Sequence, residues 1–438
     1  MPLLKQLEEK ILRILSEEVV PAQGCTEPIA LAYTAAKARE ILAETVERVE
    51  VRVSGNMIKN VKSVVVPNSG GMVGIETSVA MGIVAGDSKK DLMVICDITP
   101  DDMMHVRDFL AYKRVDVFHV ESEAKLYVEV KVFGKTHEAS VEIKHMHTNI
   151  TKILKDGELL LDRPCNDMDF NSSCEDREIL SIALIYEMAK TIEFSKIQPL
   201  FRQVITLNSH IAHEGLQGHY GVNIGKIICD NIQKGFYGDD VRNRAAAFAS
   251  AGSDARMSGC ALPVMTTSGS GNQGMTSSLA LIEYANIMGL PEEKLIRSLF
   301  FSHLSTVHIK SNVGRLSAYC GVICSAAAVS GALAFLNDEN LEIVSHSIGN
   351  TLGDVSGIIC DGAKSSCAMK IATTIYAAFD GYMLASQGRF LQGGDGIIAH
   401  DIEATLRNIG ALSQDGMYIT DKVIIDIMSK NHAKKQGN

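Results

Sequence analysis

The sequence predicts an α+β protein in which a smaller α+β domain is inserted into a large, mostly helical domain. Residues 3–19 place leucine and isoleucine at helical spacing, and residues 46–165 contain segments that alternate β-branched and polar residues. After residue 175 the chain returns to long segments rich in alanine, leucine and isoleucine. We therefore expect N-terminal helices at 1–45 that pack on the helical domain, the inserted domain at 46–165 and the helical domain at 166–438.

The N-terminal part is predicted to contain two helices with a turn between them. The first helix covers residues 3–19, and the turn at 21–24 has the sequence Pro-Ala-Gln-Gly. Thr26 is a suitable N-cap for the second helix, which we expect to reach about Leu42. Glu27 and Pro28 are residue types that favour a first helical turn.

The middle of the chain is predicted to form strands with two helices between them. The strand patterns lie at 49–53, 61–66, 92–98, 115–120, 126–133 and 137–144, and the helical patterns lie at 71–85 and 100–111. The rest of the chain is predicted to be helical at 175–193, 220–234, 277–289, 291–306, 316–336 and 366–386. Several of these segments are apolar on nearly all sides, which indicates helices inside a larger bundle.

Charge and hydropathy exclude several classes of protein. The formal net charge is −10, and acidic and basic residues are interspersed rather than grouped. Nucleic-acid-binding proteins usually carry a basic patch, so we expect no nucleic acid partner. Acidic residues interrupt the apolar N-terminus and no apolar run is long enough for a membrane span. We expect a cytoplasmic protein without membrane contact, and the sequence leaves a homo-oligomer open.

Four of the ten cysteines are crowded into the last third of the chain. Disulfides are not expected in a reducing cytoplasm, so these thiols are core residues, ligands or nucleophiles. Cys320 begins a predicted helix, and Cys324 follows one turn later. Cys360 and Cys367 lie at the two ends of a loop that contains Gly, Ser and Asp residues. Such a loop offers backbone N–H groups to a metal centre. Because no Cys-x-x-Cys pair is present, spacing alone leaves the ligand and core interpretations even.

Residues 268–274 form a glycine- and serine-rich stretch directly before a predicted helix. Free N–H groups at a helix start, together with short hydroxyl and amide side chains, suit a carboxylate ligand. The candidate binding residues are Ser268, Gly269, Ser270, Gly271, Asn272 and Gln273. The alternatives are a flexible linker and the similar loop of pyridoxal-phosphate enzymes. The chain has no lysine between Lys234 and Lys294 to form the Schiff base, so the pyridoxal alternative is disfavoured.

Cys25 directly precedes the second predicted helix, where the helix dipole and free N–H groups should lower the pKa of its thiol. A thiolate there would serve as a base or nucleophile, and the alternative is a residue beside the N-cap with no chemical role. The two interpretations are comparable from the sequence.

Several histidines and cationic residues are further candidates for the site. His210, His213 and His219 lie together, but Gly215 and Gly218 should break a helix there, so zinc is disfavoured and a polar wall of the site remains open. His145 and His147 are expected to alternate on a strand as a structural pair, with substrate contact as the alternative. For Arg256, Lys310 and Arg315 ordinary ion pairs are favoured over pairing with a carboxylate or a metal centre.

Three strings resemble those of the L-cysteine desulfidase family, which is related to the alpha chain of the iron–sulfur L-serine dehydratases. The strings are residues 21–28 (Pro-Ala-Gln-Gly-Cys-Thr-Glu-Pro), 253–257 (Ser-Asp-Ala-Arg-Met) and 268–274 (Ser-Gly-Ser-Gly-Asn-Gln-Gly), and the similarity extends over nearly the whole chain. In that family three cysteines bind a 4Fe-4S cluster. The resemblance assigns this role to Cys320, Cys360 and Cys367, which are 40 and 7 positions apart, and leaves Cys324 in the helix interior.

The resemblance implies a lyase that removes the β-substituent of a small amino acid and converts L-cysteine to pyruvate, ammonia and sulfide. A cluster with one iron that no cysteine ligates would polarise the substrate as a Lewis acid. Cys25 would act as base or as a reversible cluster ligand. L-serine is the alternative substrate, because one atom in a small pocket changes selectivity without changing a motif. A non-enzymatic iron–sulfur sensor is the alternative from another class.

Overall fold

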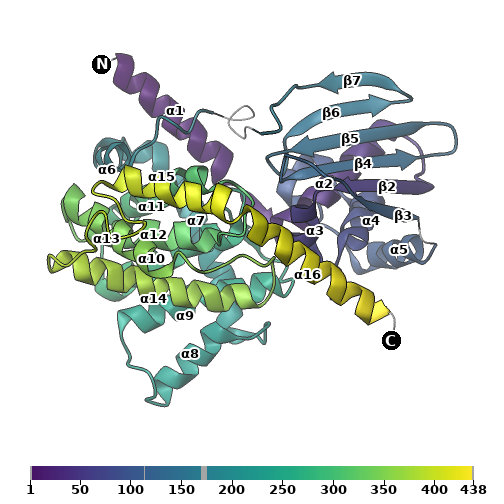
Figure 1. Cartoon of the computed structure of the whole chain (residues 1–438). Helices are drawn as coiled ribbons and strands as arrows, with labels where there is room; N and C mark the ends of the chain where they lie inside the picture. The colour runs from purple at the N-terminus through teal and green to yellow at the C-terminus, as the bar shows by residue number, and fades with distance from the viewer. Residues whose placement is uncertain (1, 113, 169–174, 437–438) are drawn as a thin grey trace.

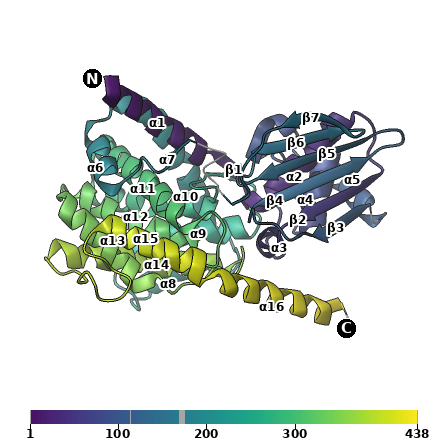
Figure 2. The same ribbon diagram turned by 45° about the horizontal axis from the view of Figure 1, so that its top comes forward.

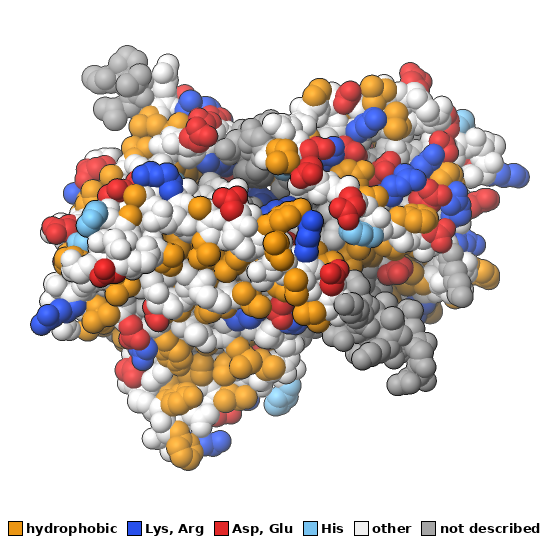
Figure 3. Space-filling model, in the orientation of Figure 1, with side chains coloured by type: hydrophobic (Ala, Val, Ile, Leu, Met, Phe, Trp, Pro, Cys, Tyr) orange, Lys and Arg blue, Asp and Glu red, His pale blue; other side chains and the backbone are white. Residues whose placement is uncertain are grey.

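The computed structural model describes residues 2–112, 114–168 and 175–436 and confirms the α+β fold with a mostly helical body. Figures 1 and 2 show two lobes side by side, a helical body and a unit built on a six-stranded sheet. Acidic and basic side chains are interspersed over both lobes on the face drawn in Figure 3. In the described residues no helix has both the length and the apolar character that a membrane span requires.

The helical body surrounds one large apolar core. Its helices are α6 (Ile182–Thr191), α7 (Phe194–Gln217), α8 (Ile224–Gln233), α9 (Val241–Met257), α10 (Gly271–Met288), α11 (Glu292–Val313), α12 (Gly321–Leu336), α13 (Leu341–Val355), α14 (Ser366–Ser386), α15 (Ile402–Ala411) and α16 (Tyr418–Gln436). A π-helical turn, η3 (Leu412–Gly416), joins the last two. Helix α12 is buried over almost its whole length, as its uninterrupted apolar composition predicts.

The α+β unit packs helices on one face of a mixed sheet in the order β3-β2-β4-β5-β6-β7. The strands are β2 (Arg48–Val53), β3 (Val115–His119), β4 (Tyr127–Phe133), β5 (Glu138–Lys144), β6 (Ile150–Lys155) and β7 (Glu158–Asp162). The helices are α2 (Thr26–Leu42), α3 (Gly55–Val61), α4 (Ile75–Ala85), α5 (Pro100–Ala111) and the short 3-10 helix η1 (Ser88–Met93). Burial alternates along β2 and β4, since their valines face the core while charged residues face outward.

Two expected strands are wrong. Residues 92–98 form the end of η1 and a series of turns. Residues 61–66 comprise the last residue of α3 and the turn after it, and they contribute a single bridge between Val65 and Val73. Both segments are short apolar runs without strict alternation, and such runs do not define a strand by themselves. Strands β6 and β7 were not predicted, because charged residues at the edge of the sheet weaken the alternation there.

The two N-terminal helices pack on different lobes, which corrects the expectation that both join the helical body. Helix α1 (Pro2–Glu18) buries Ile11, Ile14 and Leu15 in the core of the helical body. Helix α2 instead buries its alanine- and leucine-rich faces in the core of the α+β unit. Its small side chains allow close approach, and the carbonyl oxygen of Ala32 lies only 2.2 Å from where a side chain on Gly82 of α4 would begin.

A short two-stranded sheet lies where the two lobes meet (Figure 2). Strand β1 (Pro21–Gln23) pairs antiparallel with β8 (Pro263–Met265), and Pro21 lies opposite Met265. Cys25 follows β1 directly, and the loop 268–274 follows β8. The pairing therefore brings two segments more than 200 residues apart in sequence to the same place.

A buried ion pair joins the C-terminal helix to the α+β unit. The Nζ atom of Lys59 on α3 lies 2.5 Å from Oδ1 of Asp421 on α16, and the two side chains are 1% and 9% exposed. Asp421→Asn leaves the lysine charge buried without its partner, so we expect a loss of roughly 3–5 kcal/mol in the free energy of unfolding. Urea denaturation checks this value.

The matched control is Asp338→Asn, because Asp338 pairs with Lys294 at 2.7 Å while its side chain is 81% exposed. Exposed pairs contribute at most about 1 kcal/mol. Equal destabilisation by the two substitutions would show that burial of the Lys59–Asp421 pair has no energetic consequence.

Candidate functional site

Four helix N-termini meet at one cavity between the two lobes, which we call the inner cavity. Cys25 is the N-cap of α2, Ser270 of α10 and Cys320 of α12, while Cys367 lies in the first turn of α14. All four residues line the inner cavity. Because the N-terminal end of a helix carries partial positive charge, this arrangement stabilises anions such as thiolates or carboxylates.

The three cysteines with the predicted spacing reach the inner cavity together. The backbone N–H of Cys320 donates to Ile358 O at 3.2 Å, and that of Cys360 donates to Ala318 O at 2.6 Å, so the two segments lie side by side. Burial raises the pKa of the Cys320 thiol, and the neighbouring thiols of Cys360 and Cys367 raise it further. The three thiols are therefore neighbours, and a bound cation would favour their ionised, thiolate forms.

Cys324 takes no part in this group. It is fully buried in the core of the helical body and does not line the inner cavity. This agrees with its expected place in the helix interior. Across the described ranges no three His, Cys, Asp or Glu side chains are grouped tightly enough to hold a single metal ion, and no disulfide links the cysteines found there.

Cys25 is held as a thiol, contrary to the expectation from its place at a helix start. Its side chain is 3% exposed, and its Sγ donates to Oε2 of Glu27 at 3.0 Å. Burial and the Glu27 carboxylate raise the pKa of the Cys25 thiol well above its usual range, while Arg256 opposes them. Burial of the sulfur, together with the Glu27 charge packed against it, outweighs the effect of the helix dipole on the pKa of Cys25. Cys25 also packs in one small cluster with Cys367.

The loop 268–274 also lines the inner cavity, and Thr26 Oγ1 donates to Gly269 O at 2.7 Å, which holds the loop beside Cys25. Its cavity-lining members are Ser268, Gly269, Ser270, Asn272 and Gln273. Gly271 packs against the guanidinium of Arg256 and does not line the cavity. The Oε1 atom of Gln273 is buried and has no hydrogen-bond partner within the described structure. A buried polar atom in this state indicates room for a polar ligand.

Three cationic side chains line the inner cavity: Arg256, Lys310 and Arg315. Arg256 donates from Nε to Gly24 O at 2.9 Å, and Arg315 pairs with the buried carboxylate of Glu18 at 2.7 Å. Burial lowers the pKa of Lys310, whereas the thiols near it act in the opposite direction. The cavity therefore combines thiols with positive charge, as a site for an anionic group requires.

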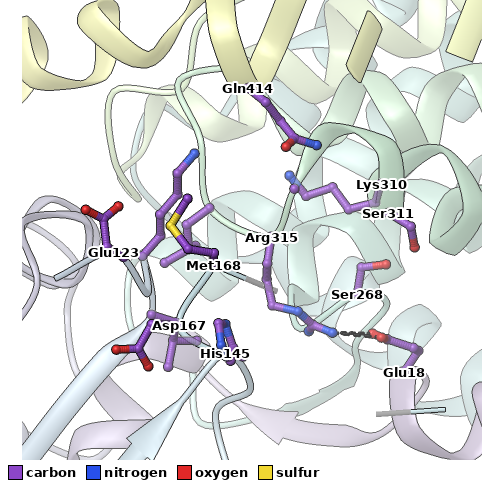
Figure 4. A pocket seen from close by; sticks show the side chains of 14 residues that line it. Glu18, Glu123, His145, Asp167, Met168, Ser268, Lys310, Ser311, Arg315 and Gln414 are labelled. Atoms are coloured by element: carbon purple, nitrogen blue, oxygen red, sulfur yellow. Dashed lines mark hydrogen bonds and ion pairs between the residues drawn. The ribbon is translucent and has the colours of Figure 1, made fainter. Parts of the chain in front are cut away.

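An outer cavity of about 280 Å³ adjoins the inner one, and its side chains are shown in Figure 4. The two cavities share Ser268, Lys310, Arg315 and Leu316. In the close-up, Arg315 points from the centre of the outer cavity toward Glu18, and the ion pair between them is drawn as a dashed line. Residues of both lobes line the outer cavity. The four shared residues line the outer cavity as well as the inner one.

His147 lines the inner cavity, although the sequence favoured a structural role for it over substrate contact. It lies in the turn after β5 rather than on a strand, and it enters the inner cavity from the α+β unit. Its imidazole is 4% exposed, and Nε2 has no hydrogen-bond partner within the described ranges. His145 turns away, and its Nε2 lies 2.8 Å from Asn166 O. The expected structural pair is therefore wrong, and Thr148-Asn149 beside these histidines was the available signal.

The other histidine cluster does not reach the inner cavity. His210 and His213 lie on α7, which continues through Gly215 and ends at Gln217. Gly215 lies inside α7 and does not break the helix. A side chain at this position would begin only 1.9 Å from Ala251 O on α9. Close packing of two helices therefore explains this glycine, and the polar-wall interpretation of the cluster is not supported.

Another buried histidine, His303, contacts Thr267 directly before the loop 268–274. His303 is fully buried, and its Nδ1 lies 2.6 Å from Thr267 Oγ1. Burial lowers the pKa of His303 to about 3. An unfolded chain takes up this proton near pH 6.5, so the folded state loses stability as pH falls from about 6.5 toward 3.

We therefore expect His303→Asn to flatten the dependence of stability on pH, because an amide can replace Nδ1 in the bond to Thr267 without titrating. The difference in slope between pH 6 and 5 should be roughly 1 kcal/mol per pH unit. Urea denaturation at several pH values measures it. Parallel curves for the two proteins would contradict a buried neutral His303.

The fold and this cavity define a two-lobed protein whose candidate site combines three thiols, helix N-termini and a glycine- and serine-rich loop. The profile of the family described as serine dehydratase alpha chain matches residues 89–426. A UPF0597 protein of Fusobacterium nucleatum is 59% identical over 422 residues, which cover 96% of this chain and 99% of that protein. A UPF0597 protein of Desulfitobacterium hafniense is 46% identical over 418 residues, covering 95% and 96%.

The chain belongs to the serine dehydratase alpha chain family. Membership points to a lyase of the serine dehydratase type. The match includes the loop 268–274 and all three clustered cysteines, but it begins after Cys25.

Proposed function

We propose that the protein is a 4Fe-4S-dependent lyase of the cytoplasm that converts L-cysteine to pyruvate, ammonia and sulfide. The observation that carries the proposal is the meeting of Cys320, Cys360 and Cys367 with Cys25 and the loop 268–274 at one cavity. Family membership supports elimination from a small amino acid. L-serine is the alternative substrate on the same cluster.

The donor set fits an iron–sulfur cluster. Cys320, Cys360 and Cys367 line the same cavity as four helix N-termini and the side chains of Arg256 and Lys310, which would help to balance the negative charge of iron-bound thiolates. A cube of four irons is bound at separate corners, so its cysteine ligands lie farther apart than the ligands of one ion. The thiols would lose their protons on binding, as metal ligands do.

Cys25 packs beside Cys367 in one small cluster and donates to Glu27. Of the two roles that the resemblance implies for Cys25, we propose the reversible cluster ligand rather than the base. A cluster ligand must lie beside the other thiols, and Cys25 packs beside Cys367. A base must be deprotonated before it acts, and the raised pKa of the Cys25 thiol does not favour that state.

The chain's own residues would hold and orient the substrate. The loop 268–274, with Arg315 beside Gly269, would bind the carboxylate of the amino acid. When bound, a cluster with an open iron supplies Lewis-acid assistance to the leaving group. Loss of the α-proton and cleavage of the bond from Cβ to sulfur give aminoacrylate, which water converts to pyruvate and ammonia.

Anaerobic purification, iron and sulfide analysis, and pyruvate assays on L-cysteine and L-serine test the proposal. We expect sulfide and pyruvate in equal amounts from L-cysteine. Turnover of L-serine alone would establish the alternative substrate. A loaded cluster without turnover of either amino acid would indicate the non-enzymatic sensor, and activity in iron-free protein that needs pyridoxal phosphate would overturn the cluster.

A further inference from the structure

His147 is held in the inner cavity by a tight turn that joins β5 to β6. Met146 N donates to Lys144 O at 2.7 Å, Asn149 N donates to Met146 O at 3.2 Å, and His145 has a positive φ of 64°. These contacts reverse the chain and project His147 out of the α+β unit toward the helical body. Among histidines in the described ranges, His147 is the one that lines the inner cavity.

The ring of His147 lies against the proposed carboxylate loop. A side chain added at Gly269 would begin 2.9 Å from its Cε1 and 3.0 Å from its Nδ1, which places the imidazole in contact with the loop backbone. The Nε2 atom has no partner inside the described part of the protein although the residue is 96% buried, since only 4% is exposed. A buried nitrogen without a partner destabilises the folded protein, and a hydrogen bond to a bound ligand would offset this cost.

Burial, rather than the charges that face His147, favours a neutral imidazole before substrate binds. Glu27 of α2 and Glu18 of α1 act to raise its pKa, while Arg315 and Arg256 of the helical body act to lower it. Burial is the largest effect and lowers the pKa of His147 to about 4. A carboxylate bound beside the two arginines would screen their repulsion, so the imidazole would accept a proton more readily once substrate is in place.

We propose that His147 is the catalytic residue that accepts the α-proton of the bound amino acid, through its unpartnered imidazole nitrogen. The inference rests on the proposed function and names the base for it. The proton moves from Cα to His147, the Cα–H electron pair becomes the Cα=Cβ bond, and the pair of the Cβ–S bond leaves on sulfur. The proton on His147 then passes to the departing sulfur, which restores the neutral imidazole without any oxidant or reductant.

The test compares His147→Gln with His105→Gln in holoenzyme prepared without oxygen. His105 is an exposed histidine of α5 in the same lobe, so the exchange of residue type is the same. For His147→Gln we expect kcat to fall by about 10²–10⁴-fold, the loss typical of removing a general base, with iron and sulfide content unchanged. With α-deuterated substrate the isotope effect on kcat should increase, because proton removal becomes rate-limiting. His105→Gln should behave as the parent protein.

The outcomes separate this inference from the function on which it rests. A parent protein that forms pyruvate from neither amino acid refutes the proposed function. An active parent with a His147→Gln variant of equal kcat and isotope effect refutes only the role of His147. A variant that no longer holds iron also overturns the role as base, because His147 would then support the cluster instead.

Discussion

Each of the single substitutions Cys320→Ala, Cys360→Ala and Cys367→Ala should prevent formation of the cluster and remove the activity. Loss of residues that merely orient metal ligands costs about 10–100-fold in affinity or activity, so loss of a direct ligand should exceed about 100-fold. The three thiols lie at the N-cap of α12, in the loop after α13 and in the first turn of α14. Iron and sulfide analysis after anaerobic reconstitution measures the result independently of turnover.

Cys324→Ala is the matched control, because Cys324 lies one turn from Cys320 on α12 but is fully buried in the helical core. Its loss creates a small cavity and should cost about 1 kcal/mol of stability without changing the iron content. A full cluster in Cys360→Ala, or an empty one in Cys324→Ala, would contradict the ligand assignment.

Gly269→Ala should reduce kcat/KM by about 100-fold or more, since a displacement of about 1 Å in a positioning group has this effect. Gly269 has a φ of +72°, and an added Cβ would lie 2.4 Å from Nη1 of Arg315 and 2.9 Å from Cε1 of His147. The methyl group would therefore displace the loop, the arginine or the histidine. Steady-state kinetics at constant iron content measures the loss.

Gly235→Ala is the control for backbone strain. Gly235 has a φ of +73°, almost the same as Gly269, but no heavy atom lies within 4 Å of the position of its Cβ. Both substitutions carry the cost of about 1–2 kcal/mol for a left-handed residue with a side chain. Only Gly269→Ala adds the collision, so similar kinetics in the two variants would mean that the contacts of Gly269 are irrelevant to catalysis.

Local sequence signals predicted the bounds of a helix well where those bounds depend on residues of that helix alone. Helix α14 begins and ends where its apolar pattern predicts, and α5 has the expected bounds with Thr99 as its cap. The residue types of the candidate site were also evident from the sequence. The three cysteines with the predicted spacing, the glycine–serine loop and Cys25 before α2 all line the inner cavity.

The wrong expectations about α2 and Gly215 share a cause, because each depended on residues far away in the chain. Helix α2 has small residues on every side, so its own pattern does not say which lobe it covers. Gly215 was interpreted as a helix breaker, although the close approach of Ala251 on another helix explains it. Propensity and periodicity describe a segment, whereas packing partners decide its neighbours.

The sequence by itself determined the fold class, most of the elements and the kinds of side chain available for chemistry, because helical and strand periods and cysteine spacing are local properties. Only the tertiary structure decided the state of those side chains. It placed Glu27 against Cys25 and raised the pKa of that thiol, and it brought His147 into the cavity from the other lobe. Electrostatic and packing energies depend on distances between atoms in space, and β1, β8 and the turn after β5 set those distances.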